Sequence, residues 1–328
     1  AVQQRWGLRS FLLCRLLTGC CAGASPVAKA YLADLGAASG KLPQFMAWRE
    51  AATTLAFIAG PLVGGKLYAA TSSLASVIGM TALGSIAASA LVSTLVFEDS
   101  NAADSASKPT KRMPNSNADG LIACPLGSNL VAAVVTVCFV SALYNCGSST
   151  FAAFFAPLAH EVAGLDVQGV GFAYTCLSSI SFLISVKVSA PLQRAFGTVA
   201  AAVCGLFSVG IGLIGMGLVT TASLGLSANM RTTYFWLAAM IYQVGVPLFT
   251  PTVPTMLLQC VPRQRRGTMM GIDEACNTVA RVGAPIAFGT LYAKFGASAC
   301  CGGAGFAVLL AALLAMFRRF VVLRAAYA

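Results

Sequence analysis

Nine apolar stretches, each about as long as a membrane-crossing helix, limit the fold of this chain more than any other feature. The hydrocarbon core of a bilayer is about 30 Å thick, and about 20 helical residues cross it. Hydrophobic residues make up 58% of the chain and charged residues only 9%, whereas soluble proteins carry about 25% charged residues. We therefore expect an all-α polytopic membrane protein. The predicted spans are residues 11–32, 48–68, 74–97, 130–155, 169–188, 199–219, 234–258, 269–292 and 299–320.

A polar stretch at residues 98–127 divides these spans into a group of three and a group of six. It reads EDSNAADSASKPTKRMPNSNADGLIACPLG, and this composition is typical of a flexible linker. We expect residues 1–97 to form the C-terminal part of a first helical half. Residues 128–328 are expected to form a second half with six spans.

Lys and Arg are distributed unevenly between the connections. With the N-terminus outside, 13 of the 21 basic residues fall on the cytoplasmic side, 5 on the outer side and 3 within spans. Because basic residues accumulate in cytoplasmic loops, we expect the linker and the C-terminus to be cytoplasmic. The net charge of +11 is then a topology signal, and no nucleic-acid partner is expected.

The residue types that build metal sites and enzyme centres lack the usual spacings. The twelve Cys contain no Cys-x-x-Cys and are interpreted as small apolar residues packed between helices. The single His, His160, lies in an outer loop beside Glu161. No zinc-binding His/Glu spacing, phosphate-binding Gly loop or nucleophile elbow is found. We therefore expect a protein that is not an enzyme and that needs no metal or cofactor.

One span occurs twice in the same orientation. Residues 50–69 (EAATTLAFIAGPLVGGKLYA) and 274–293 (EACNTVARVGAPIAFGTLYA) share nine identities in twenty without a gap. Parallel repeats are typical of transporters built from two halves. The offset of 224 residues predicts roughly 95 residues before Ala1, enough for three more spans. Six helices plus six, acting as a monomer, would then be the complete protein.

Motifs in three regions resemble those of the major facilitator superfamily and follow the family's order. Arg15, Gly19 and Asp34 are similar to the fourth-helix motif, and residues 262–271, PRQRRGTMMG, are similar to the basic loop before helix eleven. The stretch GPLVGG at residues 60–65 resembles the fifth-helix signature of antiporters, including drug:proton antiporters. The resemblance implies two six-helix bundles around a site for a small-molecule substrate, with protons as the coupling ion. Its structural residues would include Gly60, Pro61, Gly64 and Gly65.

The family also uses an Asp and basic loops as a charge latch that holds one gate state. The resemblance carries this role to Asp34 and to Arg265, Arg266 and Gly267. The alternative is that these residues form an ordinary solvated surface at the cytoplasmic helix ends.

Two arginines lie inside predicted spans, where a charge is costly and usually functional. Arg281 lies 12 residues past Met269, about 18 Å along a helix, and is expected to face the central cavity. Its alternative role is a structural partner for a buried acid or carbonyl. Arg15 is expected to face the same cavity, and the alternative is that its side chain extends outward to the membrane surface.

The repeated span has one polar face in each copy. Residues at steps of three or four share that face, and we expect both faces to line the interface between the halves. The alternative is that the Thr and Asn side chains only bond neighbouring helices. The face comprises Glu274, Asn277, Thr278, Arg281 and Pro285 in the second copy, with Glu50 and Pro61 matching Glu274 and Pro285.

Weaker polar stripes occur in two other spans. Tyr144 and Asn145 belong to one, and Gln243 belongs to the other. The second stripe also contains Pro247 and Pro254, and these two prolines together with Pro251 should bend their helix and free carbonyl groups. All three polar side chains are candidates for the substrate cavity.

These observations predict a secondary active transporter of a small organic solute that works by alternating access and resembles antiporters. Within transport, the alternative is an uncoupled facilitator of a sugar or an organic anion. Outside transport, it is a membrane receptor or scaffold with the same fold. The lipid bilayer and a small-molecule substrate are the expected partners.

Overall fold

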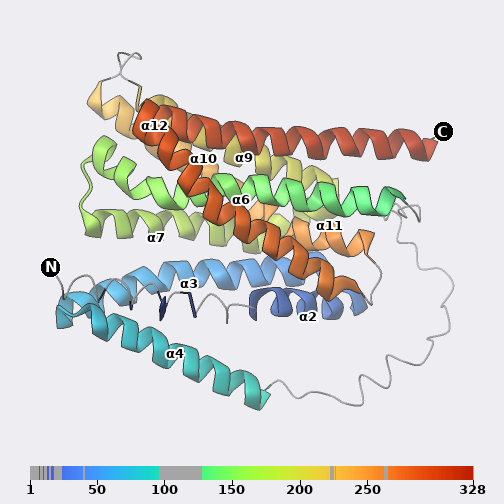
Figure 1. Ribbon diagram of the computed structural model, residues 1–328, viewed down its shortest axis with the longest axis horizontal. Helices are drawn as coiled ribbons and strands as arrows, with labels where there is room; N and C mark the ends of the chain where they lie inside the picture. Colours follow the sequence, from blue (N-terminus) through green and yellow to red (C-terminus); the bar gives the residue numbers. More distant parts are fainter. Residues whose placement is uncertain are drawn as a thin grey trace. The chain divides into compact units, whose positions relative to one another are not determined.

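The computed structural model describes residues 24–39, 41–95, 128–221, 227–261 and 265–327, with isolated positions between 7 and 17 and at residue 225. Every element in these ranges is helical (Figure 1). The helices are α2 (Ala24–Ala38), α3 (Leu42–Thr71), α4 (Leu74–Leu95), α6 (Ser128–Ala163), α7 (Val167–Ile184), the π-helix η1 (Ser185–Ser189), α8 (Ala190–Phe196), α9 (Thr198–Val219), α10 (Ala228–Phe249), α11 (Thr252–Cys260) and α12 (Arg266–Tyr327).

Six stretches of the described chain are long and apolar enough to cross a membrane. The last of them, Gly267–Phe317, has 51 residues, far more than the roughly 20 that one crossing needs. It contains the predicted span 269–292 and most of the predicted span 299–320, and the two are separated at Gly296, where the backbone is not helical and φ is 83°. Helix α3 falls outside the six, since Arg49, Glu50 and Lys66 lower its hydropathy. The prediction of an all-α polytopic membrane protein is confirmed.

The chain divides into two compact units. One unit contains residues Ala1–Ile58 and Ala123–Ala328, and the other contains Ala59–Ile122. The boundary falls inside α3, so the first half of this helix belongs with α2 and with the helices that follow residue 123. Contacts between α2 and the start of α3 on one side and α6 to α12 on the other therefore lie within a single unit.

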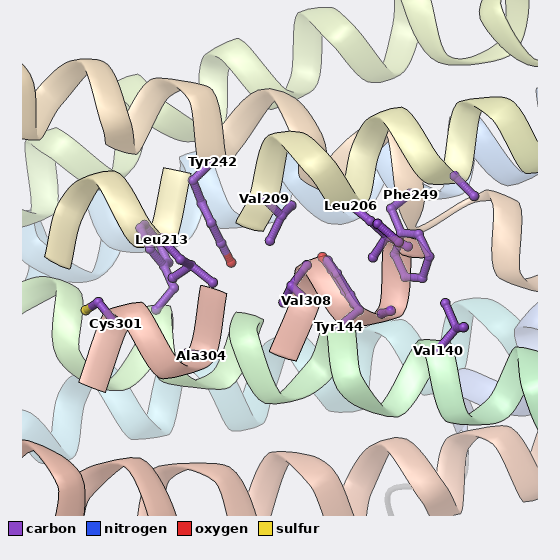
Figure 2. Close-up of a cluster of buried hydrophobic side chains, with 14 of the residues drawn as sticks. Val140, Tyr144, Leu206, Val209, Leu213, Tyr242, Phe249, Cys301, Ala304 and Val308 are labelled. Carbon is purple, nitrogen blue, oxygen red and sulfur yellow. The ribbon is translucent and has the colours of Figure 1, made fainter. Parts of the chain in front are cut away.

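The core of the larger unit lies between α6, α9, α10 and α12, which pack side by side (Figure 1). Figure 2 shows side chains from these helices filling the space between them. Aromatic rings pack across it: the ring of Tyr144 lies 4.5 Å from that of Phe249, and Phe151 stacks on Tyr242 at 4.0 Å. Such offset and stacked pairs contribute beyond the area they bury.

Helices α9 and α10 approach closely because glycines face the contact. A Cβ atom on Gly212 would lie 2.5 Å from the backbone N of Tyr242, and one on Gly245 would lie 2.5 Å from the carbonyl O of Gly205. Small residues that let backbones meet are the usual means of helix association in lipid. These glycines therefore set the α9–α10 spacing.

The prolines near residue 250 break the span predicted at 234–258, as expected from their chemistry. Helix α10 ends at Phe249 and α11 begins at Thr252, with Pro251 between them. Pro247 lacks the N–H that would bond to the carbonyl of Gln243, and the hydroxyl of Ser181 on α7 donates to that carbonyl at 2.8 Å. The serine thus satisfies a carbonyl that the proline leaves free inside the membrane.

The α9–α10 contact gives a stability prediction. Gly212→Ala should lower the free energy of unfolding by about 1–3 kcal/mol, because the new methyl group must push α10 away. Thermal unfolding of the protein in detergent measures this. Gly171→Ala on α7, where an added Cβ meets nothing within 4 Å, is the matched control and should not destabilise. Equal stability of the two variants would contradict the close contact.

Candidate functional site

Three charged side chains meet where α2 packs against α12. The Lys29 Nζ atom on α2 donates to Glu274 Oε2 on α12 at 2.6 Å, and both side chains are 19% exposed. Arg281 Nη2 donates to the other carboxylate oxygen of Glu274. Glu274 therefore holds two cations, one on each oxygen. We call these residues, together with Asp273, the charge cluster.

Helical geometry brings Arg281 to Glu274. The two residues are seven positions apart, which puts them on one face about 10 Å apart along the axis. Side chains on a helix point toward its N-terminus, so the long Arg281 side chain extends back to Glu274. Its Nε atom donates to the carbonyl of Asn277 on the way, at 3.3 Å. The Arg281 side chain remains 46% exposed, so part of the guanidinium can reach a ligand.

Asp273 precedes Glu274 on α12, and hydrogen bonds connect its carboxyl group to α6. It is buried, with 4% of its surface exposed. Asn277 Nδ2 donates to Asp273 Oδ2 at 3.0 Å, and the Ser141 hydroxyl on α6 donates to Asn277 Oδ1 at 2.9 Å. Asp273 Oδ1 has no hydrogen-bond partner among the described atoms. This short chain of hydrogen bonds fixes Asp273 against α6.

Two further polar contacts join the first part of α3 to the helices after residue 123. Gln44 Oε1 accepts from Arg194 Nη2 on α8 at 3.2 Å. The Glu50 side chain reaches the hydroxyl of Thr250, at the end of α10. With Lys29–Glu274, these contacts link the two predicted halves at three places within one compact unit.

The structure brings together part of the predicted cavity face. Arg281, Asn277 and Glu274 belong to the charge cluster or contact it, whereas Thr278 is exposed and its hydroxyl donates only to the carbonyl of Glu274 on its own helix. Asn277 bonds α12 to α6, and Arg281 contacts an acid and a carbonyl. For both residues the structural role named as the alternative is therefore present.

The predicted residues of the other stripes lie apart from the cluster's ion pairs. Tyr144 is buried against Phe249 in the core. Asn145 donates to the carbonyl of Ser141 on its own helix at 2.9 Å, and Gln243 offers its backbone carbonyl to Ser181. None of these contacts tests a role in a cavity, so that role stays a prediction.

The predicted gating and motif residues are only partly described. Gly60, Gly64 and Gly65 lie on α3 in the smaller unit. Arg265 and Gly267 are exposed near the start of α12, and Pro285 lies inside α12. Arg15 and the side chains of Asp34, Pro61 and Arg266 lie outside the described parts, so their predicted roles stay predictions.

Two residues of the cluster were missed as sites by sequence reasoning, although a signal was present. Lys29 and Asp273 are both charged residues within predicted spans, and that alone marks a residue for attention. In the aligned repeat, position 49 is Arg where position 273 is Asp. The two copies of the helix therefore differ in charge at this position as well as at Arg281.

The shallow hollow lined by Asn229, Met230, Thr233 and Tyr234 has a volume of about 330 Å³. It lies at the start of α10 and contains no charged side chain. The buried charges, rather than this depression, are therefore the candidate site.

Comparison with known proteins agrees with the helical membrane fold. Residues 3–226 and 137–325 match the family model described as Major Facilitator Superfamily. A solved structure, the crystal structure of the human organic anion transporter MFSD10 (TETRAN), aligns with a TM-score of 0.67 at 20% identity. The alignment covers 94% of this chain and 71% of that one. Among curated proteins, none matches.

The hydrogen-bond chain around Asp273 predicts unequal effects for two neighbouring substitutions. Asn277→Leu should reduce the free energy of unfolding by about 1–3 kcal/mol, because it leaves the buried Ser141 hydroxyl and Asp273 oxygen without partners. Thr278→Val, one position along, should change it by less than about 0.5 kcal/mol, since Thr278 is exposed. Thermal unfolding in detergent compares the two. An Asn277→Leu variant as stable as the unchanged protein would contradict a contribution from these hydrogen bonds.

Proposed function

The chain belongs to the major facilitator superfamily, and we propose that it carries a small organic anion across the membrane by alternating access. The family and the fold make it an integral, multi-pass membrane transport protein. The observation that supports the finer proposal is the pair Lys29–Glu274, which joins the two predicted halves, with Arg281 on the same carboxylate.

The ion pair is suited to act as a latch between the halves. In surroundings of low dielectric constant, two charges at contact attract far more strongly than in water, and separating them without new partners is expensive. The halves can therefore move apart only if something replaces the pair. A ligand shifts such an equilibrium by the difference in its affinity for the two states.

An anion can provide that replacement. Lys29 and Arg281 share the single carboxylate of Glu274. An anionic group that binds one of these two cations therefore leaves the other cation paired with Glu274. The half-exposed guanidinium of Arg281 presents donors suited to carboxylate or sulfonate groups. The solved structure with a similar fold is described as an organic anion transporter, which agrees with this substrate class.

The remaining predictions from the sequence fit this proposal. The glycines at residues 60–65 resemble an antiporter signature, which favours exchange. We propose a cytoplasmic C-terminus from the distribution of basic residues, a cavity role for Arg15, and a second latch of Asp34 with Arg265 and Arg266. The 98–127 linker would connect the two moving halves.

Flux measurements test the transport proposal. We expect purified protein in liposomes to take up benzenesulfonate, a permanently charged anion, and to reject benzyltrimethylammonium. Arg281→Gln should reduce anion uptake by about 10-fold to 100-fold, the value of a lost hydrogen bond to a charged group. Arg281→Lys should retain part of it, since Lys keeps the charge but loses the planar fork.

Lys294→Gln is the matched control, because it removes one positive charge from an exposed position on the same helix. Uptake that does not depend on Arg281 would refute the proposed site. Equal uptake of neutral benzenesulfonamide would favour the facilitator, and binding without any flux would favour the receptor.

The latch predicts an asymmetry between its two partners. Glu274→Gln should destabilise the protein more than Lys29→Gln, because the first removes the carboxylate that Lys29 and Arg281 share and the second leaves Glu274 paired with Arg281. The difference should be about 1 kcal/mol or more in thermal unfolding. The charge swap Lys29→Glu with Glu274→Lys should recover part of the loss. A swap as unstable as the worse single variant would argue against direct pairing.

A further inference from the structure

We propose that Asp273 binds a transported proton, and that its protonation decides whether the charge cluster accepts an anion, so that proton and anion cross in the same direction. This inference rests on the anion transport proposed above. It names the coupling ion and the sign of the coupling.

The first argument is the surroundings of Asp273. The carboxyl group is 4% exposed, lies inside a span, and has one oxygen, Oδ1, without a partner among the described atoms. A buried carboxylate with an unsatisfied oxygen is unfavourable in a membrane, whereas a neutral carboxylic acid is tolerated. Its other oxygen accepts from Asn277, which Ser141 holds in place. The group is therefore fixed in position and can gain a proton without rearrangement of its neighbours.

The second argument is that the nearby cations are already engaged elsewhere. Lys29 acts on Asp273 electrostatically but forms its hydrogen bond with Glu274. Arg281 also bonds to Glu274. Asp273 thus lies beside a Lys–acid pair without being part of it.

Other titratable groups lie near the cluster. Cys138 on α6 interacts electrostatically with Asp273 and with Cys276 on α12. Glu50 on α3 is buried and interacts electrostatically with Arg49 and Lys29. Within the charge cluster itself, the balance is set by Lys29, Arg281, Glu274 and Asp273.

The charge balance fixes the sign of the coupling. With Asp273 ionised, two cations face two carboxylates and the cluster is neutral. When Asp273 takes up a proton, two cations face one carboxylate, and the single excess positive charge attracts an anion. Proton and anion therefore favour each other's binding, and this linkage is reciprocal. The proton adds to a carboxylate oxygen and leaves from the same atom, so no bond in the substrate changes.

Joint binding means that the loaded state carries one proton with one monoanion. That step moves no net charge. It is opposite in sign to the antiport predicted from the glycine signature at residues 60–65. That signature contains no charged residue, so it can shape helix packing without setting which ions move together.

The first experiment needs no substrate. Infrared difference spectra of the purified protein between low and high pH should show the carbonyl stretch of a protonated carboxylic acid that disappears as pH rises. Asp273→Asn should remove the component of this band that comes from a carboxyl group shielded from water, and Asp166→Asn should leave that component. Asp166 is an exposed cap of α7 that accepts from Gly169 N, and Asn caps a helix equally well. A spectrum of Asp273→Asn that retains this component would overturn the proton site.

The second experiment tests the coupling. In liposomes, an inward proton gradient should drive benzenesulfonate accumulation by up to about tenfold per pH unit, the limit for one proton per anion. The interior should acidify as the anion enters, and a potassium diffusion potential should have no effect. Asp273→Asn mimics the protonated state, so it should keep exchange of labelled for unlabelled anion while losing the response to the gradient. Asp166→Asn should behave as wild type.

The outcomes separate the two proposals. Asp273→Glu retains an acid and should retain gradient-driven uptake, which keeps the test valid if the Asn variant does not fold. Uptake driven by a gradient of the opposite direction would establish antiport and overturn the sign. Gradient-driven uptake that persists in Asp273→Asn would overturn the residue. If no anion flux is found at all, anion transport fails, while the infrared band still decides whether Asp273 binds a proton.

Discussion

The requirement that polar groups be satisfied without water governs this structure. In a bilayer, each free carbonyl or charge needs a partner from the protein itself. The hydroxyl of Ser181 accordingly takes the carbonyl that Pro247 leaves free, and Ser208 donates to the carbonyl of Ile241 on α10 at 2.6 Å. The same requirement assembles the charge cluster, since Lys29 and Arg281 can remain inside only because Glu274 neutralises them in part.

A partner that satisfies a charge can also release it, and this connects the fold to transport. Bonds such as Ser181 to Gln243 join helices of the same predicted half and can persist throughout a cycle. The Lys29–Glu274 pair joins different predicted halves, so the alternating access proposed above would have to separate Lys29 from Glu274. In that proposal the pair holds the halves together and gives way to an anion, whereas the hydrogen bonds of the core only hold helices together.

The sequence was most informative where the determining physics is local. Span positions follow from apolar runs, and the bend near residue 250 follows from proline chemistry. The depth of Arg281 in the membrane indicated an acid or carbonyl partner as the alternative to a cavity role. The Lys29–Glu274 contact joins residues 245 positions apart, which no local pattern specifies. Asp273 was missed because neighbours on a helix point about 100° apart: Glu274 faces α2, while Asp273 is fixed against α6 through Asn277 and Ser141.

The repeated span now separates architecture from chemistry. Glu50 and Glu274 occupy equivalent positions, and each crosses to the opposite predicted half, where Glu50 reaches Thr250 and Glu274 binds Lys29. Because both copies carry this acid and both acids contact the opposite predicted half, we assign Glu50 and Glu274 to the contact between the halves. The copies differ at the flanking positions: Arg49 and Phe57 stand where the second has Asp273 and Arg281. The transport role proposed above belongs to Asp273 and Arg281, because these charges of the second copy lie beside the shared acid Glu274 in the charge cluster.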